Sequence, residues 1–518
     1  MKTKEFSRAG RVAGPLKKVL AAAIISFGSM QAQADTLWEI YQLALENDPQ
    51  LAADRAAYEA GLEAKNLGRS ALLPQINGSA EANNTDTTAT QFDYTFGPTG
   101  VIATPNSSDT DVDERIYSAR LDQALFDASA WFGYKQGKKV SEQAAAEFSA
   151  NQQAMMLRVS DAYFDVLRAV DDLETARAEE EALAQQLEQT QQRFEVGLTA
   201  ITDVYDARAA HDSAVARLYD AQDILLSAFD ALSVLTGQHH DDIAPLSETF
   251  SVAPPEPVDR SAWVDFALAN NFDLKAARLN AEAARYNARA AASEHLPTLT
   301  GSVSYQDFRR EGDSSTTVAG EPTVDLPIDT TRETTITAVT LNVPIFSGGR
   351  ISASRREARN LSFQAEDLRN LVQRSTIQDT RTLHRSVVTD VSRVNARKQA
   401  IISARSALDA TQAGYEVGTR NVVDVLLAQQ TLFQARRDYS ASLYSYILNT
   451  LRLKRAAGLL APKDLQDLET RLNPGSAVSR AIARQGASMP LGGSQDTVEP
   501  TSPAAIEESA EEPGTSPN

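Results

Sequence analysis

The sequence contains no cysteine in its 518 residues. This absence excludes disulfide bonds, thiol catalysis, zinc–thiolate sites and acylation at a lipoprotein cysteine. Basic side chains are also in the minority, because 50 Lys+Arg stand against 69 Asp+Glu. An acidic chain is a poor partner for nucleic acid, whose phosphates require a basic surface. We therefore expect no nucleic-acid partner.

Catalytic motifs are missing as well. The sequence shows no nucleophile–base constellation, no glycine-rich phosphate loop and no HExxH motif. One short run, His239-His240-Asp241-Asp242, has metal-binding residue types, but neighbouring side chains cannot easily converge on one ion. We therefore predict that the protein is not an enzyme and that it has no cofactor and no metal site.

Long apolar runs are absent except at the N-terminus. There, six basic residues precede the run VLAAAIISFGSM, which ends in AQA before Asp35. This pattern predicts a secretory signal peptide over residues 1–34, cut after Ala34, and the alternative of an uncleaved anchor is disfavoured by the short apolar core. Without another such run, the mature chain can enter a membrane only as a closed β-barrel.

The sequence repeats itself. RFEVGLTAITDV (193–204) matches GYEVGTRNVVDV (414–425) at an offset of 221 residues, and RLDQALFDAS (120–129) matches TLNVPIFSGG (340–349) at an offset of 220. We infer two homologous halves separated by a proline-rich connector. The predicted segments are the first repeat 35–240, the connector 241–259 and the second repeat 260–460. A short segment 461–474, which we expect to pack beside the connector at the middle of the helical body, and a disordered acidic tail 475–518 follow.

Both halves follow the same order of elements. A short helical segment ends at Leu-Pro, two Thr- and Ser-rich stretches with alternating apolar residues follow, and a long helical hairpin without proline completes the half. The predicted strands are about 74–84, 113–126, 298–309 and 334–346, with polar loops about 84–112 and 310–333, and the predicted hairpins are 127–236 and 348–458. Four strands cannot close a barrel, because about eight are needed. The chain must therefore oligomerise, and three copies would supply twelve strands and twelve long helices.

Two stretches carry a resemblance to a known family. Residues 162–209 and 406–436, which include both EVG turns, resemble the TolC family of outer-membrane channel-tunnels. The resemblance implies a mixed α and membrane β fold, in which a homotrimeric 12-stranded outer-membrane β-barrel continues as a periplasmic α-helical barrel. It also implies an exit duct for drugs, detergents, bile-salt-like compounds or proteins in a Gram-negative bacterium. The implied partners are a periplasmic membrane-fusion adaptor, an inner-membrane efflux transporter or ABC exporter, and outer-membrane lipid.

The resemblance also assigns roles to residues at the two EVG turns. A latch that holds the duct closed corresponds to Thr202, Asp203, Tyr415 and Arg420. Adaptor docking corresponds to Gly197, Leu198, Gly418, Thr419 and Arg420. The periplasmic constriction carries two acidic rings in the family, and Asp424 matches the first.

The second acidic ring departs from the family pattern. The family's Asp falls on Leu427 here, and the equivalent position of the first repeat is Asp206. Either the ring has moved to Asp206 in the other repeat, or Asp206 is a solvated helix charge and the ring is lost. The sequence leaves both alternatives open.

A different class of function is a periplasmic scaffold or trimeric surface protein without a conducting path. Two features oppose it, namely the barrel-like strand pairs and the acidic rather than apolar hairpin tips. Conductance in a bilayer separates the two hypotheses.

Overall fold

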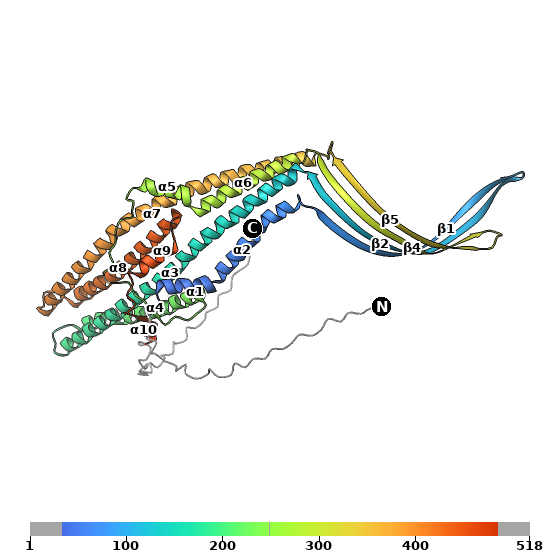
Figure 1. The fold of residues 1–518 in the computed structure, drawn as a ribbon. Helices are drawn as coiled ribbons and strands as arrows, with labels where there is room; N and C mark the ends of the chain where they lie inside the picture. Colours follow the sequence, from blue (N-terminus) through green and yellow to red (C-terminus); the bar gives the residue numbers. More distant parts are fainter. Residues whose placement is uncertain (1–33, 248, 485–518) are drawn as a thin grey trace, which may run out of the picture.

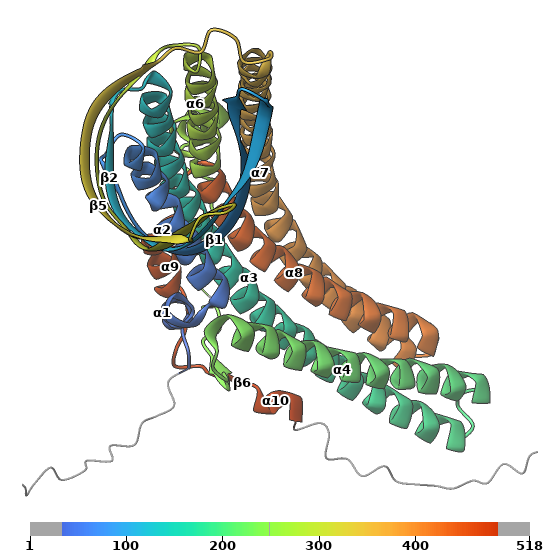
Figure 2. The same ribbon diagram turned by 90° about the vertical axis from the view of Figure 1, so that its right-hand side faces the viewer.

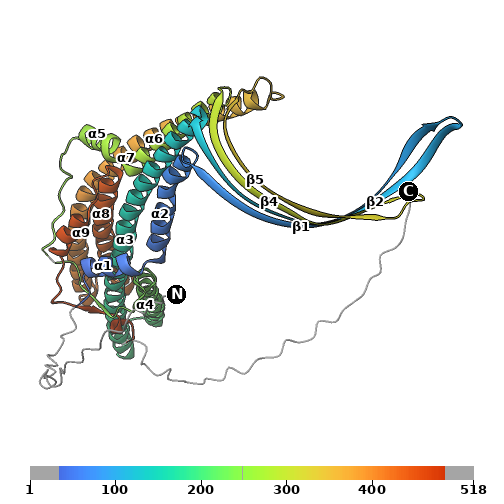
Figure 3. The same cartoon turned by 45° about the vertical axis from the view of Figure 1, so that its right-hand side comes forward.

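The computed structural model describes residues 34–247 and 249–484. Figure 1 shows a body of long helices and a curved sheet of long strands that projects from one end of it. In the view turned by 45°, the sheet projects from the end of the helical body where α2, α3, α6 and α7 connect to the strands (Figure 3). The predicted signal peptide, except for Ala34, and most of the predicted acidic tail lie outside the described residues.

The first half contains two short helices, two strands and a long helical hairpin. Thr36 begins the half with a capping box, in which its hydroxyl accepts from Glu39 N at 3.3 Å. Asp48 separates the two short helices and caps the second, whose first residue is Pro49. The elements are α1 (Leu37–Asn47), α2 (Pro49–Ser70), β1 (Gln75–Gly97), β2 (Gly100–Phe126), α3 (Ala128–Glu195) and α4 (Ile201–Thr236).

The second half repeats this order. Asn271 separates its two short helices and caps the second through Leu274 N at 2.8 Å, as Asp48 does in the first half. The elements are α5 (Arg260–Asn270), α6 (Phe272–Ser293), β4 (Thr298–Val318), β5 (Val324–Asn342), α7 (Arg350–Glu416) and α8 (Val422–Ala456). Short elements outside the repeats are β3 (Asp242–Ile243), α9 (Pro462–Glu469), β6 (Val478–Ser479) and α10 (Ala481–Arg484).

The long strands form one antiparallel sheet in the order β1-β2-β4-β5. The two repeats meet in the middle of the sheet, where β2 pairs with β4, and β1 and β5 form its two edges. Seen along its length, the sheet curves into an arc (Figure 2). The edges of this arc carry backbone groups that have no strand partner among residues 34–247 and 249–484.

The strands are longer than the sequence predicts. We expected polar loops over about 84–112 and 310–333, but β1 and β2 pair up to Gly97 and Gly100, and β4 and β5 pair up to Thr316 and Val324. The expectation was wrong because it limited each strand to the length of a bilayer crossing. Polar side chains support the extra ladder by bonding across strands, as Thr88 does to Asp109 at 2.9 Å.

Strand β5 is shorter at its other end than predicted. It ends at Asn342 instead of residue 346. Pro344 follows two residues later, and proline has no N–H to donate to a ladder. The chain then turns at Gly348 and Gly349, which adopt φ values of 61° and 82°, and enters α7.

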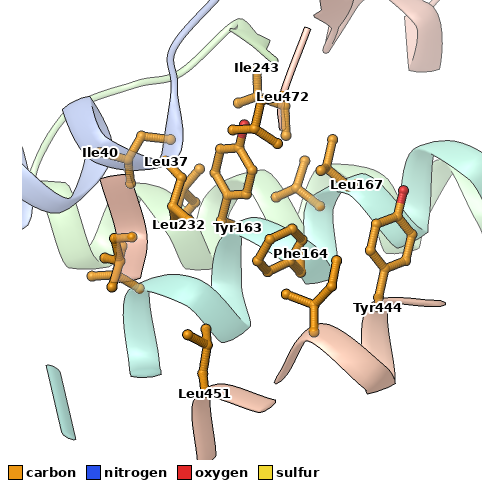
Figure 4. Packing of buried hydrophobic residues seen from close by; sticks show 14 of the residues in the cluster. Leu37, Ile40, Tyr163, Phe164, Leu167, Leu232, Ile243, Tyr444, Leu451 and Leu472 are labelled. Atoms are coloured by element: carbon orange, nitrogen blue, oxygen red, sulfur yellow. The ribbon is translucent and has the colours of Figure 1, made fainter. Parts of the chain in front are cut away.

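The main core lies where the two repeats meet in the helical body. Figure 4 shows Tyr163 and Phe164 of α3 surrounded by apolar side chains of α1, α4 and α8. The Tyr163 hydroxyl donates to Ala244 O at 2.5 Å, and the ring centroids of Phe164 and Tyr444 lie 5.9 Å apart. Burial of these large side chains stabilises the contact between α3 and α8 by the hydrophobic effect.

The C-terminal segment is ordered for longer than predicted. Residues 475–484 were expected to belong to a disordered tail, but β6 pairs with β3, and Val478 is buried. Arg480 is also buried and donates to Asp230 of α4 at 2.8 Å. These contacts correct the prediction, because the acidic residues that suggested disorder all follow this segment in the sequence.

Within the described ranges, no helix combines the length and the apolar composition that are needed to cross a membrane.

One buried carboxylate joins three helices. Glu179 of α3 is 1% exposed and forms ion pairs with Arg217 of α4 at 2.9 Å and with Arg437 of α8 at 2.8 Å. A buried carboxylate is stable only when its charge is compensated. Glu179 therefore links the first hairpin to the second.

We predict that Glu179→Gln lowers the free energy of unfolding by about 2 kcal/mol, because two guanidinium groups lose their counter-charge while the buried site persists. Chemical denaturation of the purified protein measures this change. Glu181→Gln, an exposed position on the same helix, is the matched control and should change stability little. Equal stability of both variants would contradict the assigned role of Glu179.

Candidate functional site at the hairpin tips

The two EVG sequences form the turns at the tips of the hairpins. Gly197 and Gly418 both have a φ of 77°, in the left-handed region that favours glycine. At the first tip Leu198 N donates to Arg193 O at 2.8 Å, and at the second Thr419 N donates to Gly414 O at 2.9 Å. The repeated sequence therefore encodes the same helix-ending turn twice.

The acidic residue that follows each turn lies in the first turn of the return helix, where a negative charge complements the helix dipole. Asp424 forms a capping box with Asn421, whose side-chain oxygen accepts from Asp424 N at 2.8 Å. Asp203 accepts instead from the hydroxyl of Thr199. Both carboxylates therefore have a local structural role.

Tyr415 occupies an unusual environment at the second tip. It is 4% exposed and packs against Val422 and Val425 of α8. The Arg193 guanidinium of the first hairpin lies 4.6 Å from its ring centroid, which is cation–π geometry. Its hydroxyl has no hydrogen-bond partner in the part of the chain that the structure describes.

The structure does not connect the two sides of the predicted latch within one chain. Thr202 is exposed, and Asp203 is engaged by Thr199. Arg420 lies 3.7 Å from Asp424 on its own hairpin. Between residues 34 and 484, residue 248 apart, no hydrogen bond or ion pair joins Thr202 or Asp203 to Tyr415 or Arg420. The latch therefore stays a prediction.

Sequence reasoning missed Arg193 as a residue of this site. The equivalent position in the second repeat is Gly414, where an added Cβ would lie 2.8 Å from Arg420 Cγ. Gly414 thus leaves room for Arg420, while Arg193 reaches across to Tyr415. The difference between the two EVG turns, arginine in one and glycine in the other, is the signal that could have identified both roles.

The remaining predicted residues of the site lie on exposed surfaces. Asp206 on α4 is exposed, and no ion pair engages it among the described residues. Leu427 on α8 is 57% exposed. Of the predicted docking residues, Leu198 is 68% exposed, and the neighbouring Val196 and Val417 are 69% and 75% exposed. The tips thus present apolar side chains to solvent beside acidic ones.

The histidine pair outside the tips makes separate contacts. His239 Nε2 lies 2.9 Å from Arg480 Nη1. His240 is buried, and its ring nitrogens lie 2.7 Å from Asp35 Oδ2 and 2.7 Å from Thr236 Oγ1. The two rings therefore serve different packing contacts around β3 and β6.

Comparison with known proteins identifies the family. The sequence model of a protein family described as "Outer membrane efflux protein" matches residues 40–238 and again residues 263–459. The chain belongs to the outer membrane efflux protein family. Outer membrane protein TolC of Vibrio cholerae is 36% identical over 460 residues, which cover 88% of this chain and 99% of that protein. Alkaline protease secretion protein AprF of Pseudomonas aeruginosa is 30% identical over 447 residues, which cover 85% of this chain and 88% of that protein.

Solved structures agree on the fold of this outer membrane efflux protein. The CmeC outer membrane channel of Campylobacter jejuni superposes with a TM-score of 0.63 at 16% identity, covering 84% of this chain and 90% of that one. The family is one of channel and transport proteins. The chain is therefore an outer-membrane protein and an exit duct of efflux and type I secretion systems.

We predict that Asn421→Ala in this efflux protein destabilises the first turn of α8 by about 1 kcal/mol, because two backbone N–H groups lose their capping arrangement. Hydrogen exchange at the amides of residues 422–425 measures the effect. Gln430→Ala, an exposed substitution later in α8, is the control and should leave those amides unchanged. Unchanged exchange in Asn421→Ala would show that the cap does not hold this tip.

Proposed function

We propose that three copies of the chain form one duct, with a twelve-stranded β-barrel in the outer membrane and an α-helical barrel in the periplasm. The observation that carries this proposal is the open four-stranded sheet with edges β1 and β5. In lipid an unpaired edge is costly, because no water satisfies its backbone groups. All strand pairs are antiparallel, so β5 of one copy can pair with β1 of the next without breaking the pattern.

The two faces of the sheet support this arrangement. The register aligns Ile76, Leu121, Val303 and Thr337 in one row on one face, near the helical body, and three of these four side chains are apolar. The adjacent row on the other face aligns Asn77, Arg120, Ser304 and Ile336, and three of these four are polar. An apolar face suits lipid, and a polar face suits a water-filled lumen.

The length of the strands also bears on the proposal. A bilayer core of about 30 Å needs only about 10 residues of a tilted strand, whereas β2 has 27. The half nearer the turns, rich in Asp, Thr and Ser, would extend beyond the membrane. The acidic polar ladder there would form the outer mouth of the duct.

The hairpin tips would form the periplasmic entrance. The buried Tyr415 hydroxyl needs an acceptor, because an unpaired buried donor costs free energy. The carboxylate of Asp203, from the same chain or a neighbouring one, would supply it when the tips close, and Arg420 would bind alongside. Such charge-assisted bonds near solvent can break one at a time, which suits a latch that opens.

The hairpin tips would also bind the periplasmic partners of the duct. The exposed apolar side chains at the tips, next to Gly197 and Gly418, would dock a periplasmic membrane-fusion adaptor. The adaptor would connect the duct to an inner-membrane efflux transporter or ABC exporter. Protein cargo is supported by the likeness to AprF, which is named as an alkaline protease secretion protein. Small-molecule cargo, such as drugs, detergents and bile-salt-like compounds, is supported by the efflux family itself.

We predict that the wild-type trimer passes a small cation-selective current in a planar bilayer and that Tyr415→Phe/Arg420→Ser passes a current several-fold larger, because the latch then lacks both donors. Single-channel recording measures both. Equal, wide conductance of wild type and variant would refute the latch but keep the duct. No conductance from either protein would favour the scaffold hypothesis.

We predict that Asp206→Asn lowers the cation selectivity of the channel, if Asp206 supplies the second acidic ring in place of Leu427. Crowded carboxylates at a narrow entrance attract cations, and a trimer would lose three of them. Reversal potentials across a salt gradient measure the selectivity. Glu147→Gln, an exposed position 48 residues before the end of α3, is the control for a charge far from the hairpin tip. Unchanged selectivity in Asp206→Asn would assign Asp206 to the solvated helix surface.

A further inference from the structure

The two faces of the long sheet can be followed outward along β2. Near the helical body, Leu121 lies on the mostly apolar face, and Arg120 lies on the mostly polar face that suits the lumen. Strand β2 pairs with β4 without a bulge from Asn106 to Ala124. Because side chains alternate between the faces of a sheet, the odd-numbered residues of this stretch share the face of Leu121, and the even-numbered residues share that of Arg120.

Beyond the apolar rows, the face of Leu121 becomes acidic. Three successive rows of this face carry two or three carboxylates each and contain no basic side chain. These rows are Asn84, Asp113, Glu311 and Asp329, then Asp86, Asp111, Asp313 and Pro327, and then Thr88, Asp109, Ser315 and Asp325. Carboxylates are expensive in contact with lipid. This half of the sheet, which we call the outer half, therefore lies outside the membrane.

The opposite face changes in the reverse direction. At the same level its rows contain no charged side chain at all. These rows are Thr85, Val112, Gly312 and Ile328, then Thr87, Thr110, Ser314 and Leu326, and then Ala89, Ser108, Thr316 and Val324. Of the apolar side chains among them, Val324 and Leu326 are 53% and 56% exposed in a single chain. The lumen face thus loses its charges where the other face becomes acidic.

The uncharged face is the concave face of the sheet. From Ser108 to Ser118 of β2, every even-numbered residue is partly or fully buried and every odd-numbered residue is exposed. Val112 is only 1% exposed. The sheet forms an arc in cross-section (Figure 2), and its strands also bend along their length (Figures 1 and 3). Side chains on the inside of an arc shield one another, which assigns the even-numbered residues of β2 to the inside.

Gly312 marks a tight part of this curvature. An added Cβ on Gly312 would lie 2.9 Å from Val112 Cγ1, closer than real Cβ atoms approach a neighbour. A glycine inside a strand often marks a bend or a close approach of another backbone. Strands β2 and β4, which join the two repeats, therefore fold toward the concave face at the level where the charges disappear.

We propose that the concave faces of the outer halves from three copies approach one another around the duct axis and form an uncharged collar beyond the membrane. This inference rests on the proposed trimer and adds a constriction at its outer end. The uncharged rows reach both edges of the sheet, with Thr85 on β1 and Ile328 on β5. Pairing of these edges would continue the collar from one copy into the next. The convex faces cannot meet instead, because their carboxylates would repel one another.

The collar would restrict ions at the exit of the duct. Val324, Leu326 and Ile328 offer a hydrated ion neither charge nor hydrogen bonds, and apolar constrictions resist ion passage by excluding water. Cargo with apolar surface would pass at a lower cost, because it gains from contact with apolar side chains. The collar is thus a resistance to ion leakage at the end opposite the hairpin tips.

Crosslinking measures the width of the collar. Because the chain has no cysteine, Leu326→Cys places a single thiol of each copy at one level, and a short bis-maleimide should link these thiols between copies. Ser314→Cys, in the same row on β4, should be linked as well. Asp325→Cys, one residue from Leu326 on the acidic face, is the matched control and should not be linked. Denaturing gels of trimers in mild detergent measure the linked fraction.

A second control compares the collar with the barrel in the membrane. Ile336→Cys lies on the same face near the helical body, where we expect the barrel to be too wide for the linker. Native mass spectrometry first establishes that each protein is a trimer. Trimers in which neither Leu326→Cys nor Ser314→Cys is linked would overturn this inference alone and leave the uncharged face as an open wall for apolar cargo. Equal linkage of Ile336→Cys would also overturn it, because the exit would then not narrow. A wild-type protein that forms no trimer would overturn the proposed function as well.

Discussion

The structure depends above all on a backbone constraint, namely that a strand edge must find a partner. One chain supplies four long antiparallel strands, and both edges of its sheet are open. In water such an edge is a liability, and in the hydrocarbon of a membrane it is prohibitive. Pairing of β5 of one copy with β1 of the next would close these edges, and the proposed trimer follows from this pairing.

The helical body of one chain also has faces without a packing partner, but these are helix surfaces instead of strand edges. Its core is dense where the repeats meet, around Tyr163 and Phe164, and Glu179 joins the hairpins there with compensated charge. The equivalent faces on α4 and α7 are left exposed. Arg385 and Asp223 stand there in place of aromatic side chains, and an exposed aromatic pair would be an aggregation risk on a chain before it assembles. The duplicated sequence thus forms the α3–α8 contact within one chain, and it leaves the equivalent faces of α7 and α4 open to another copy.

Much of this fold could be predicted from the sequence. The duplicated EVG turns indicated two equivalent hairpins, and Gly197 and Gly418 adopt the same left-handed conformation. The lengths of β1 and β2 were not predicted, because residues 84–112 are mostly polar and only Phe92, Tyr94 and Phe96 alternate there with polar residues. Their ladder depends on cross-strand partners, and these are tertiary.

The candidate site was predicted less completely for the same reason. Propensity and spacing located Asp203 and Asp424 at helix starts, but they could not show that Arg193 covers Tyr415 from the other hairpin. Nor could they show that Val478 and Arg480 extend the ordered region, since these contacts depend on β3 and α4. Local patterns determined the elements, whereas contacts between distant segments determined the environment of each functional side chain.

The most direct test of the account is an electron cryo-microscopy map of the full-length protein in a lipid nanodisc. The account predicts three chains around one axis, with β5 of each chain paired antiparallel to β1 of the next. A map in which β1 and β5 stay unpaired would contradict it.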